Sequence, residues 1–284
     1  MTFSERLENA VRTKKSAVLV GLDPRKESLP KECSGSFYDF CVGIIDVVAP
    51  LVPAVKPQVA FFEQYGPEGM SVLQKVVRYA REKGLLVIID GKRNDIGSTA
   101  AAYADGMLGE TSVWGGDAIT VSPYLGDDSL TPFFETAEKR DCGVFVLVKT
   151  SNPGGAMLQD LKTADGKRIY QHVAGFVQTA SQKTQGTSRY GSTGAVVGAT
   201  WPEQLAELRE LMPNVWFLVP GFGAQGGSAK DVAAAFDENG LGAIVNNSRG
   251  IIFAHSQPRY AGIDWQKAVE QATREMIEQL AAVS

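Results

Sequence analysis

Hydrophobic residues in this chain gather into short continuous runs, separated by longer stretches of mixed polarity. Runs without alternation are typical of strands buried on both faces of a parallel sheet, because both sides of each strand then meet apolar neighbours. We count eight such runs, and each predicts a strand. They are Ala17–Gly21, Val52–Lys56, Leu85–Asp90, Ala118–Ser122, Gly143–Val148, Ala195–Gly198, Trp216–Val219 and Ala243–Asn246.

Helical periodicity occupies much of the sequence between these runs. The segment Gly69–Lys83 carries apolar residues at helical spacing and stops at Gly84, a residue that often follows a helix. The motif Thr2-x-x-Glu5 is a capping-box pattern and predicts a leading helix. Helices are also predicted at Pro202–Met212, Ser228–Phe236 and Trp265–Ala282.

Eight strands alternating with helices, without a break in composition, favour one closed (β/α)8 TIM barrel spanning residues 1–284. An open doubly wound sheet is the rival fold, but it usually has fewer strands. The gap from Thr150 to Thr193 is too long for one helix and its connections. Its stretch Thr163–Lys167 and the polar run Gln178–Ser192 predict an insertion or mobile loop within about 151–192.

Composition and charge narrow the possible partners. The chain has 28 Lys+Arg against 32 Asp+Glu, a net charge of −4, and no basic stripe, which argues against nucleic acid. Three scattered cysteines and two histidines favour neither a disulfide framework nor a zinc site. No apolar segment is long enough to span a bilayer, and the charged first residues do not resemble a secretory signal. We therefore expect a soluble cytoplasmic protein.

Polar residues follow directly on several predicted strands, where the active site of a barrel lies. Asp90 and Lys92 are two residues apart and therefore face the same side of the third strand. Lys56 ends the second strand and Asp95 follows the third, so two lysines and two carboxylates can alternate in space. For an isolated Asp-x-Lys, a structural salt bridge is the better explanation. The additional acid Asp23 at the end of the first strand favours a functional cluster.

The loop after the seventh strand carries Gly221-x-Gly223-x-x-Gly226, which has the spacing of a dinucleotide-binding loop. Its position near the end of the chain and the lack of an acid on the next strand argue against NAD. Loops after strands 7 and 8 of a barrel often bind phosphate instead. Together with Gln225 and Arg249, the glycines predict a site for a phosphate monoester.

From about Val18 to Ile252, the chain resembles the orotidine 5′-phosphate decarboxylase family, in particular its longer bacterial-type subfamily. The segment Asp90–Thr99 is similar to the family signature Asp-x-Lys-x-x-Asp-Ile. Sugar-phosphate decarboxylases and synthases share the core of that signature, but they carry an acid in place of Lys56 and use Mg²⁺. The sequence departs from the shorter branch of the family around Lys56-Pro57-Gln58 and at Ser248.

The resemblance implies a carboxy-lyase that converts orotidine 5′-monophosphate to UMP and CO₂ in de novo pyrimidine synthesis, without cofactor or metal. It implies that Lys92 protonates C6 and acts with Asp90, Lys56 and Asp95. Substrate contacts implied by the resemblance are Asp23 to the ribose, Ser151 to the pyrimidine, and Pro220, Gln225 and Arg249 to the phosphate. It further implies a homodimer, in which Asp95, Ile96 and Thr99 reach the neighbouring subunit's site.

Two alternative functions remain open at this point. The first is a Mg²⁺-dependent sugar-phosphate decarboxylase or aldolase, against which Lys56 argues. The second is a nucleotide-binding protein without catalytic activity on the same barrel, against which the complete Lys-Asp-Lys-Asp set argues.

Overall fold

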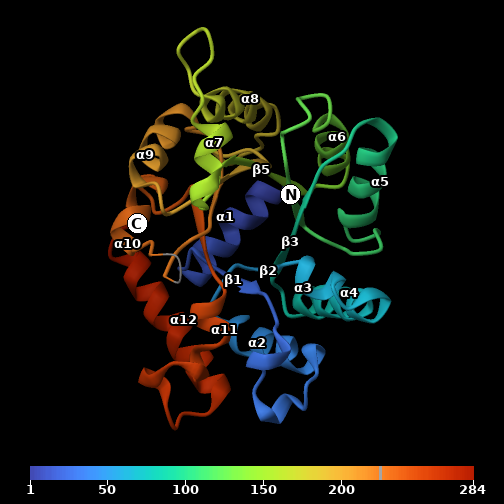
Figure 1. Ribbon diagram of the computed structural model, residues 1–284, viewed down its shortest axis with the longest axis vertical. Helices are drawn as coiled ribbons and strands as arrows, with labels where there is room; N and C mark the ends of the chain where they lie inside the picture. Colours follow the sequence, from blue (N-terminus) through green and yellow to red (C-terminus); the bar gives the residue numbers. More distant parts are fainter. Residues whose placement is uncertain (224–225) are drawn as a thin grey trace.

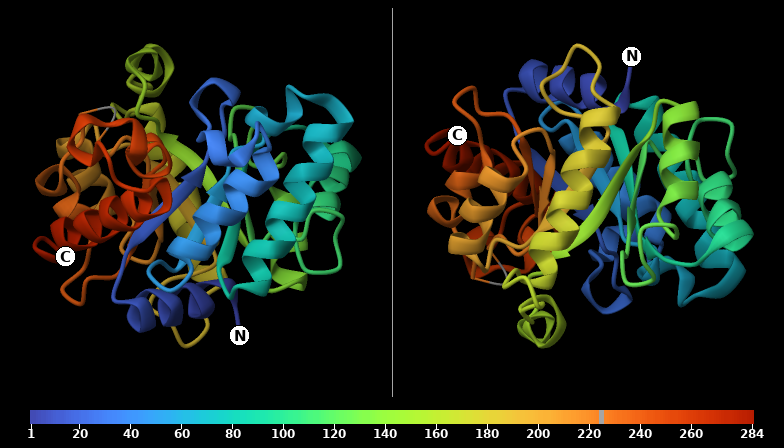
Figure 2. Two further views of the ribbon diagram at one scale, coloured as in Figure 1. Left: turned by 90° about the horizontal axis from the view of Figure 1, so that it is seen from below. Right: turned by 90° about the horizontal axis from the view of Figure 1, so that it is seen from above.

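In the computed structural model, which describes residues 1–223 and 226–284, eight parallel strands close into a barrel in sequence order. Helices surround the strands, as Figures 1 and 2 show. The predicted barrel is confirmed, and the predicted strands lie within a few residues of the observed ones. The strands are β1 Val18–Leu22, β2 Ala54–Pro57, β3 Leu86–Arg93, β4 Ala118–Val121, β5 Gly143–Lys149, β6 Thr193–Val197, β7 Phe217–Val219 and β8 Ala243–Asn247.

Helices follow the strands around the outside of the barrel, except α1, which precedes β1. They are α1 Phe3–Lys14, α2 Phe37–Val48, α3 Ala60–Glu63, α4 Gly66–Glu82, α5 Gly97–Met107, α6 Thr131–Lys139, α7 Ala156–Gln159, α8 Ile169–Lys183, α9 Pro202–Leu211, α10 Ala229–Val232, α11 Arg249–Ile252 and α12 Trp265–Ala281. Short 3₁₀ turns occupy Lys26–Ser28, Lys31–Cys33, Pro153–Gly155, Ala233–Ala235, Ala254–Ser256 and Pro258–Tyr260. The single helix predicted at Ser228–Phe236 is thus α10 followed by a 3₁₀ turn.

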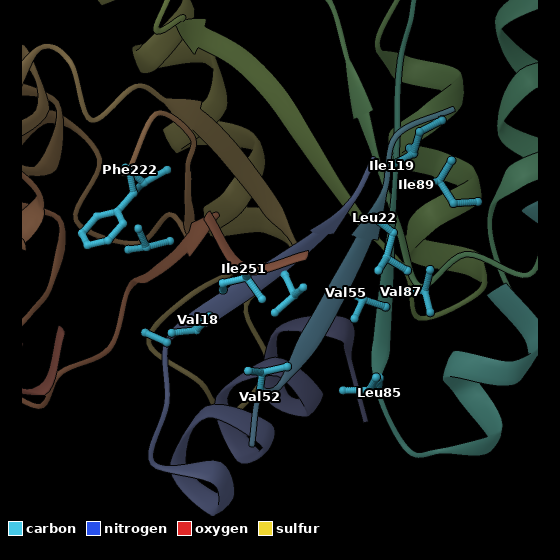
Figure 3. Packing of buried hydrophobic residues seen from close by; sticks show 14 of the residues in the cluster. Val18, Leu22, Val52, Val55, Leu85, Val87, Ile89, Ile119, Phe222 and Ile251 are labelled. Atoms are coloured by element: carbon cyan, nitrogen blue, oxygen red, sulfur yellow. The ribbon is translucent and has the colours of Figure 1, made fainter. Parts of the chain in front are cut away.

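Two apolar layers hold the barrel together. The larger lies between the strands and the surrounding helices, and Figure 3 shows part of it, including Val55, Val87 and Ile119. The smaller fills the barrel interior, where α1 contributes Phe3 and Leu7. The predicted capping box is present on α1, which begins after Thr2. Because α1 packs into the interior layer, it closes the amino-terminal end of the barrel and leaves the opposite end for a site.

The connection between β5 and β6 differs in part from the prediction. The stretch Thr163–Lys167 forms a turn that projects from the barrel (Figure 1). An antiparallel β-bridge between the flanking residues Lys162 and Arg168 closes its base. The loop interpretation is wrong for 178–183, however, because these residues complete α8. The buried face of the helix consists of Tyr170, Ala174, Val177 and Ser181. These residues recur at helical spacing, a pattern that is not apparent when polar residues are merely counted.

Within the residues that the structure describes, every helix is too short or too polar to cross a membrane.

Candidate active site

A cavity of about 410 Å³ opens at the carboxyl ends of the strands, opposite α1. Most of the residues expected at a site line it. These are Asp23, Lys56, Asp90, Lys92, Ser151, Pro220 and Arg249. Gln225, the remaining expected phosphate contact, lies outside the described residues. The cavity therefore gathers side chains from the ends of β1, β2, β3, β5, β7 and β8.

The carboxylate of Asp90 is the centre of the most polar part of this cavity. One oxygen, Oδ2, accepts hydrogen bonds from Lys56 Nζ at 2.8 Å and Gln58 Nε2 at 3.0 Å. The other, Oδ1, accepts from Lys92 Nζ at 2.7 Å and Thr120 Oγ1 at 2.9 Å. A carboxylate offers about four acceptor positions, and all four are used here. The expected alternation of lysine and carboxylate is present in this part of the cluster.

Burial and charge compete at this cluster, and charge prevails. Burial alone would raise the pKa of Asp90, but the ammonium groups of Lys56 and Lys92 hold it well below its usual range. Burial alone would lower the pKa of Lys56, yet the carboxylates of Asp90 and Asp23 raise it above its usual value. Both groups therefore stay ionised at neutral pH.

Lys92 is held in an uncommon backbone conformation at the rim of the cavity. Its φ of 43° lies in the left-handed region, which a residue with a Cβ enters only at an energetic cost. Its backbone N–H donates to Thr120 Oγ1 at 2.9 Å. The Lys92 side chain is 47% exposed, against 5% for Lys56. One ammonium group is thus locked in the interior, while the other faces the open cavity.

Two oxygen atoms in the cavity lack a partner among the described residues. Asp23 Oδ1, directly after β1, and Asn246 Oδ1, on β8, are both buried without a hydrogen-bond donor. Buried acceptors of this kind are costly unless a ligand or water donates to them. Both oxygens therefore favour a ligand that brings hydroxyl or amide donors into the cavity.

The opposite side of the cavity is suited to an anion. Arg249 is exposed and makes no ion pair with the described residues. Gly221 and Gly223 have φ values of 99° and 70°, a conformation that glycine adopts without strain. A side chain on Gly227 would lie 2.9 Å from the carbonyl oxygen of Gly221, so this loop also depends on close backbone packing. The free guanidinium and the glycine backbone are consistent with the predicted phosphate site.

Asp95, Ile96 and Thr99 lie outside the cavity of their own chain. Asp95 Oδ1 accepts from the backbone N–H of Ile96, at 2.8 Å, and from no other described residue. Ile96 is 58% exposed, which is unusual for a large aliphatic residue. Ile96 and Thr99 are exposed, Asp95 is partly exposed, and none of the three lines the cavity.

Sequence reasoning missed several polar residues that line the cavity, and three of them bear most directly on its chemistry. Gln58 and Thr120 complete the hydrogen bonds of Asp90, and Asn246 supplies an unpartnered oxygen. The spacing of Gln58, two residues after Lys56, is a signal that was available in the sequence. Thr120 and Asn246 sit within apolar strands, and only the inward direction of their side chains distinguishes them.

Comparisons with known proteins agree with this geometry. The sequence pattern of the Orotidine 5'-phosphate decarboxylase / HUMPS family matches residues 16–262. The orotidine 5'-phosphate decarboxylase of Rhodopirellula baltica is 55% identical, with 99% of both chains covered. The enzyme of the same name from Caldicellulosiruptor bescii is 42% identical over the whole of both chains.

Solved structures lead to the same family. Leishmania donovani OMP decarboxylase superposes with a TM-score of 0.77 at 34% identity, covering 100% of this chain and 98% of the other. These relatives are decarboxylases, which is the enzyme class expected from the sequence. The resemblance expected from the motifs is confirmed, and the chain belongs to the orotidine 5′-phosphate decarboxylase / HUMPS family.

Proposed function

We propose that this chain decarboxylates orotidine 5′-monophosphate to UMP and CO₂, as a step of de novo pyrimidine synthesis in the cytoplasm. The observation that carries the proposal is the array of Lys56, Asp90 and Lys92 on the cavity wall, in which Lys56 and Asp90 are buried and Lys92 faces the open cavity. Relatives that bear this activity in their names match the chain from end to end. The array also suits the difficult step of the reaction, which is the loss of CO₂.

Loss of CO₂ breaks the bond between C6 and the carboxylate and leaves its electron pair on C6. A fixed cation beside C6 stabilises this charge as it develops. In our proposal Lys92 supplies that cation and then donates a proton from Nζ to C6, which completes UMP. Its side chain is partly exposed, so the neutral amine can regain a proton from water.

Asp90 holds Lys92 in position in this scheme, and Lys56 holds Asp90. With four donors on its two oxygens, Asp90 has no free acceptor position for a divalent cation. This arrangement supports decarboxylation by ammonium groups over the Mg²⁺-dependent sugar-phosphate chemistry of other family members. Close to the substrate carboxylate, Asp90 also adds electrostatic repulsion that the loss of CO₂ relieves.

Contacts far from C6 supply the binding energy that orients the base. We assign the phosphate to Arg249, Pro220 and Gln225, of which the first two line the cavity. Asp23, with its unpartnered oxygen, is assigned to the ribose hydroxyls. Ser151 is assigned to the pyrimidine.

We also propose that the active enzyme is a homodimer, in which Asp95, Ile96 and Thr99 complete the partner's site. Their position outside their own cavity and the exposed side chain of Ile96 support this. Mixing Lys92→Ala and Asp95→Ala variants tests it, because one of the two sites in a mixed dimer regains a full set. Activity well above that of either variant alone is expected. Two inactive parents that give an inactive mixture would argue against shared sites.

The activity itself is tested by following the loss of orotidine 5′-monophosphate absorbance with purified protein in the presence of EDTA. Sustained turnover in EDTA is expected. Activity that EDTA abolishes and Mg²⁺ restores would favour the sugar-phosphate class of the family. Binding of UMP without any turnover would indicate a non-catalytic nucleotide-binding protein.

A further inference from the structure

A second buried lysine lies at the end of β5, and the proposed mechanism does not use it. Lys149 is fully buried, and its Nζ lies 2.6 Å from Asp160 Oδ1. The same ammonium group lies over the ring of Trp201, 4.7 Å from the centroid, and 5.5 Å from that of Tyr170. Removing a charge from water costs free energy even with this many partners, so the ion pair adds little net stability. We therefore consider which neighbouring residues it positions.

A shift in strand register turns Lys149 away from the cavity. The pairing of β5 with β6 is irregular between Leu147 and Lys149. Leu147 lines the cavity, whereas Lys149 contacts Asp160 just after α7, Tyr170 in α8 and Trp201 just before α9. A bulge of this kind re-aims the residues that follow it. Those residues are Thr150, Ser151 and Asn152, and all three line the cavity.

Gln159, which precedes Asp160, binds Thr150, which follows Lys149. Gln159 Oε1 accepts from the backbone N–H of Thr150 at 3.0 Å, and its Nε2 donates to Thr150 Oγ1 at 2.8 Å. Two consecutive residues at the end of α7 therefore hold two consecutive residues at the end of β5. The carbonyl oxygen of Thr150 is also bound, by Trp201 Nε1 at 2.9 Å.

Ser151 is held from the other side as well. Thr200 Oγ1 donates to its carbonyl oxygen at 2.9 Å. Any side chain at Gly198 would lie 2.7 Å from Ser151 Cα, so the segment after β6 touches the Ser151 backbone directly. The backbone around Ser151 is thus fixed by contacts outside the cavity, while Ser151 itself remains on the cavity wall.

We propose that Gln159, Asp160, Thr200 and Trp201, together named the β5 clamp, act with Lys149 as positioning residues that set the recognition of the pyrimidine by Ser151. The proposal rests on the proposed function, since it takes the base from that substrate. Among the residues that the structure describes, no hydrogen bond or ion pair joins the clamp to the Lys56–Asp90–Lys92 array or to Arg249, so we expect it to act on the base and not on the phosphate.

The test compares two ligands, UMP and ribose 5-phosphate, which lacks the base. Asp160→Asn removes the ion pair with little change of shape, and it should weaken UMP binding by up to about tenfold, which is the loss expected when one neutral hydrogen bond to the base is no longer made. Ribose 5-phosphate should bind within about twofold of wild type. Asp165→Asn, an exposed acid in the same connection, is the matched control and should leave both affinities unchanged. Equal weakening of both ligands, or of neither, would overturn the proposal.

A double-mutant cycle with Ser151→Ala separates positioning from general stability. In the Ser151→Ala background, Asp160→Asn should have almost no further effect on UMP affinity, because its action passes through Ser151. Additive losses would contradict the inference. Gln159→Ala leaves the buried charges intact and provides the same test if Asp160→Asn does not fold.

The two proposals fail in different ways. An absence of turnover by the wild-type enzyme overturns the proposed function. Wild-type turnover, together with UMP affinity in Asp160→Asn and Gln159→Ala equal to that of Asp165→Asn, overturns the role of the clamp alone.

Discussion

Two buried aspartates at opposite ends of the barrel show how similar charges serve different purposes. Asp117 precedes β4 at the amino-terminal end, and Asp90 lies near the end of β3 at the carboxyl end; their side chains are 3% and 7% exposed. Asp117 Oδ1 lies 2.6 Å from Arg6 Nη1 and 3.0 Å from Arg81 Nη1, and its Oδ2 accepts from the backbone N–H of Val87. Each carboxylate is therefore bound by two cations.

The difference lies in the cations. Arg6 and Arg81 also donate to the carbonyl oxygens of Asp141 and Gly115, so the arginines join α1 and α4 to the barrel. Guanidinium groups do not release protons under ordinary conditions. Lys92, in contrast, has one bond to Asp90 and an exposed ammonium group on the cavity. The amino-terminal end is built for stability, and the carboxyl end keeps a proton donor available.

The largest effect is expected at Lys92. Lys92→Ala should lower kcat/KM for orotidine 5′-monophosphate by at least about 10³-fold, since it removes both a donor to the developing charge, worth about 10²–10³, and the proton donor, worth about 10²–10⁴. The free energy of unfolding should change little, because the side chain is half-exposed. The spectrophotometric assay and urea unfolding measure the two quantities. Lys75→Ala, on the exposed side of α4, is the control; turnover of Lys92→Ala equal to this control would refute the assignment.

Asp117 should show the reverse behaviour. Asp117→Asn leaves two arginines without their carboxylate and should lower the free energy of unfolding by about 3 kcal/mol, as expected when a buried pair is broken. The kcat of the folded enzyme should not change. Asp105→Asn breaks an exposed pair with Arg140 and should cost less than about 1 kcal/mol. If urea unfolding showed equal losses for the two variants, Asp117 would not be the residue that secures α1 and α4 to the barrel.

Arg249 extends the comparison to the arginines. Arg249 has no ion pair among residues 1–223 and 226–284, whereas Arg81 is tied into the barrel. Arg249→Ala should weaken binding of orotidine 5′-monophosphate by about 10- to 100-fold, the range for a hydrogen bond to a charged group, without loss of stability. Binding of the nucleoside orotidine should be nearly unchanged. Titrations with both ligands check this, and equal losses would place Arg249 away from the phosphate.

The two ends also differ in how far the sequence alone predicts them. Apolar runs identify all eight strands, and the spacing of Asp90 and Lys92 predicts their shared side. The pairs of Asp117 with Arg6 and Arg81 join residues 111 and 36 positions apart, and no local pattern marks them. Thr120 is overlooked for a related reason, because a threonine in an apolar strand reveals its direction only after the barrel has closed.

The smallest expected effect is on the pH dependence of stability under alkaline conditions, where lysine side chains lose their charge. The folded state raises the pKa of Lys56, so this residue contributes stability that is complete below the pKa of an unfolded lysine, about 10.4. That contribution is lost as the pH rises through the higher pKa of the folded state. Asp117 is paired with arginines and not with a lysine, so the amino-terminal end should not add to the loss.

Lys56→Met provides the measurement, since it removes the lysine whose pKa the folded state raises and leaves the amino-terminal end unchanged. Urea unfolding between about pH 9 and 11.5 should show a steeper fall in stability for the wild type than for this variant, because only the wild type has Lys56 to neutralise. The same slope in both proteins would mean that Lys56 and Asp90 are not coupled in folding. A steeper fall in Lys56→Met than in the wild type would reverse the sign of the linkage, and with it the distinction between the two ends of the barrel.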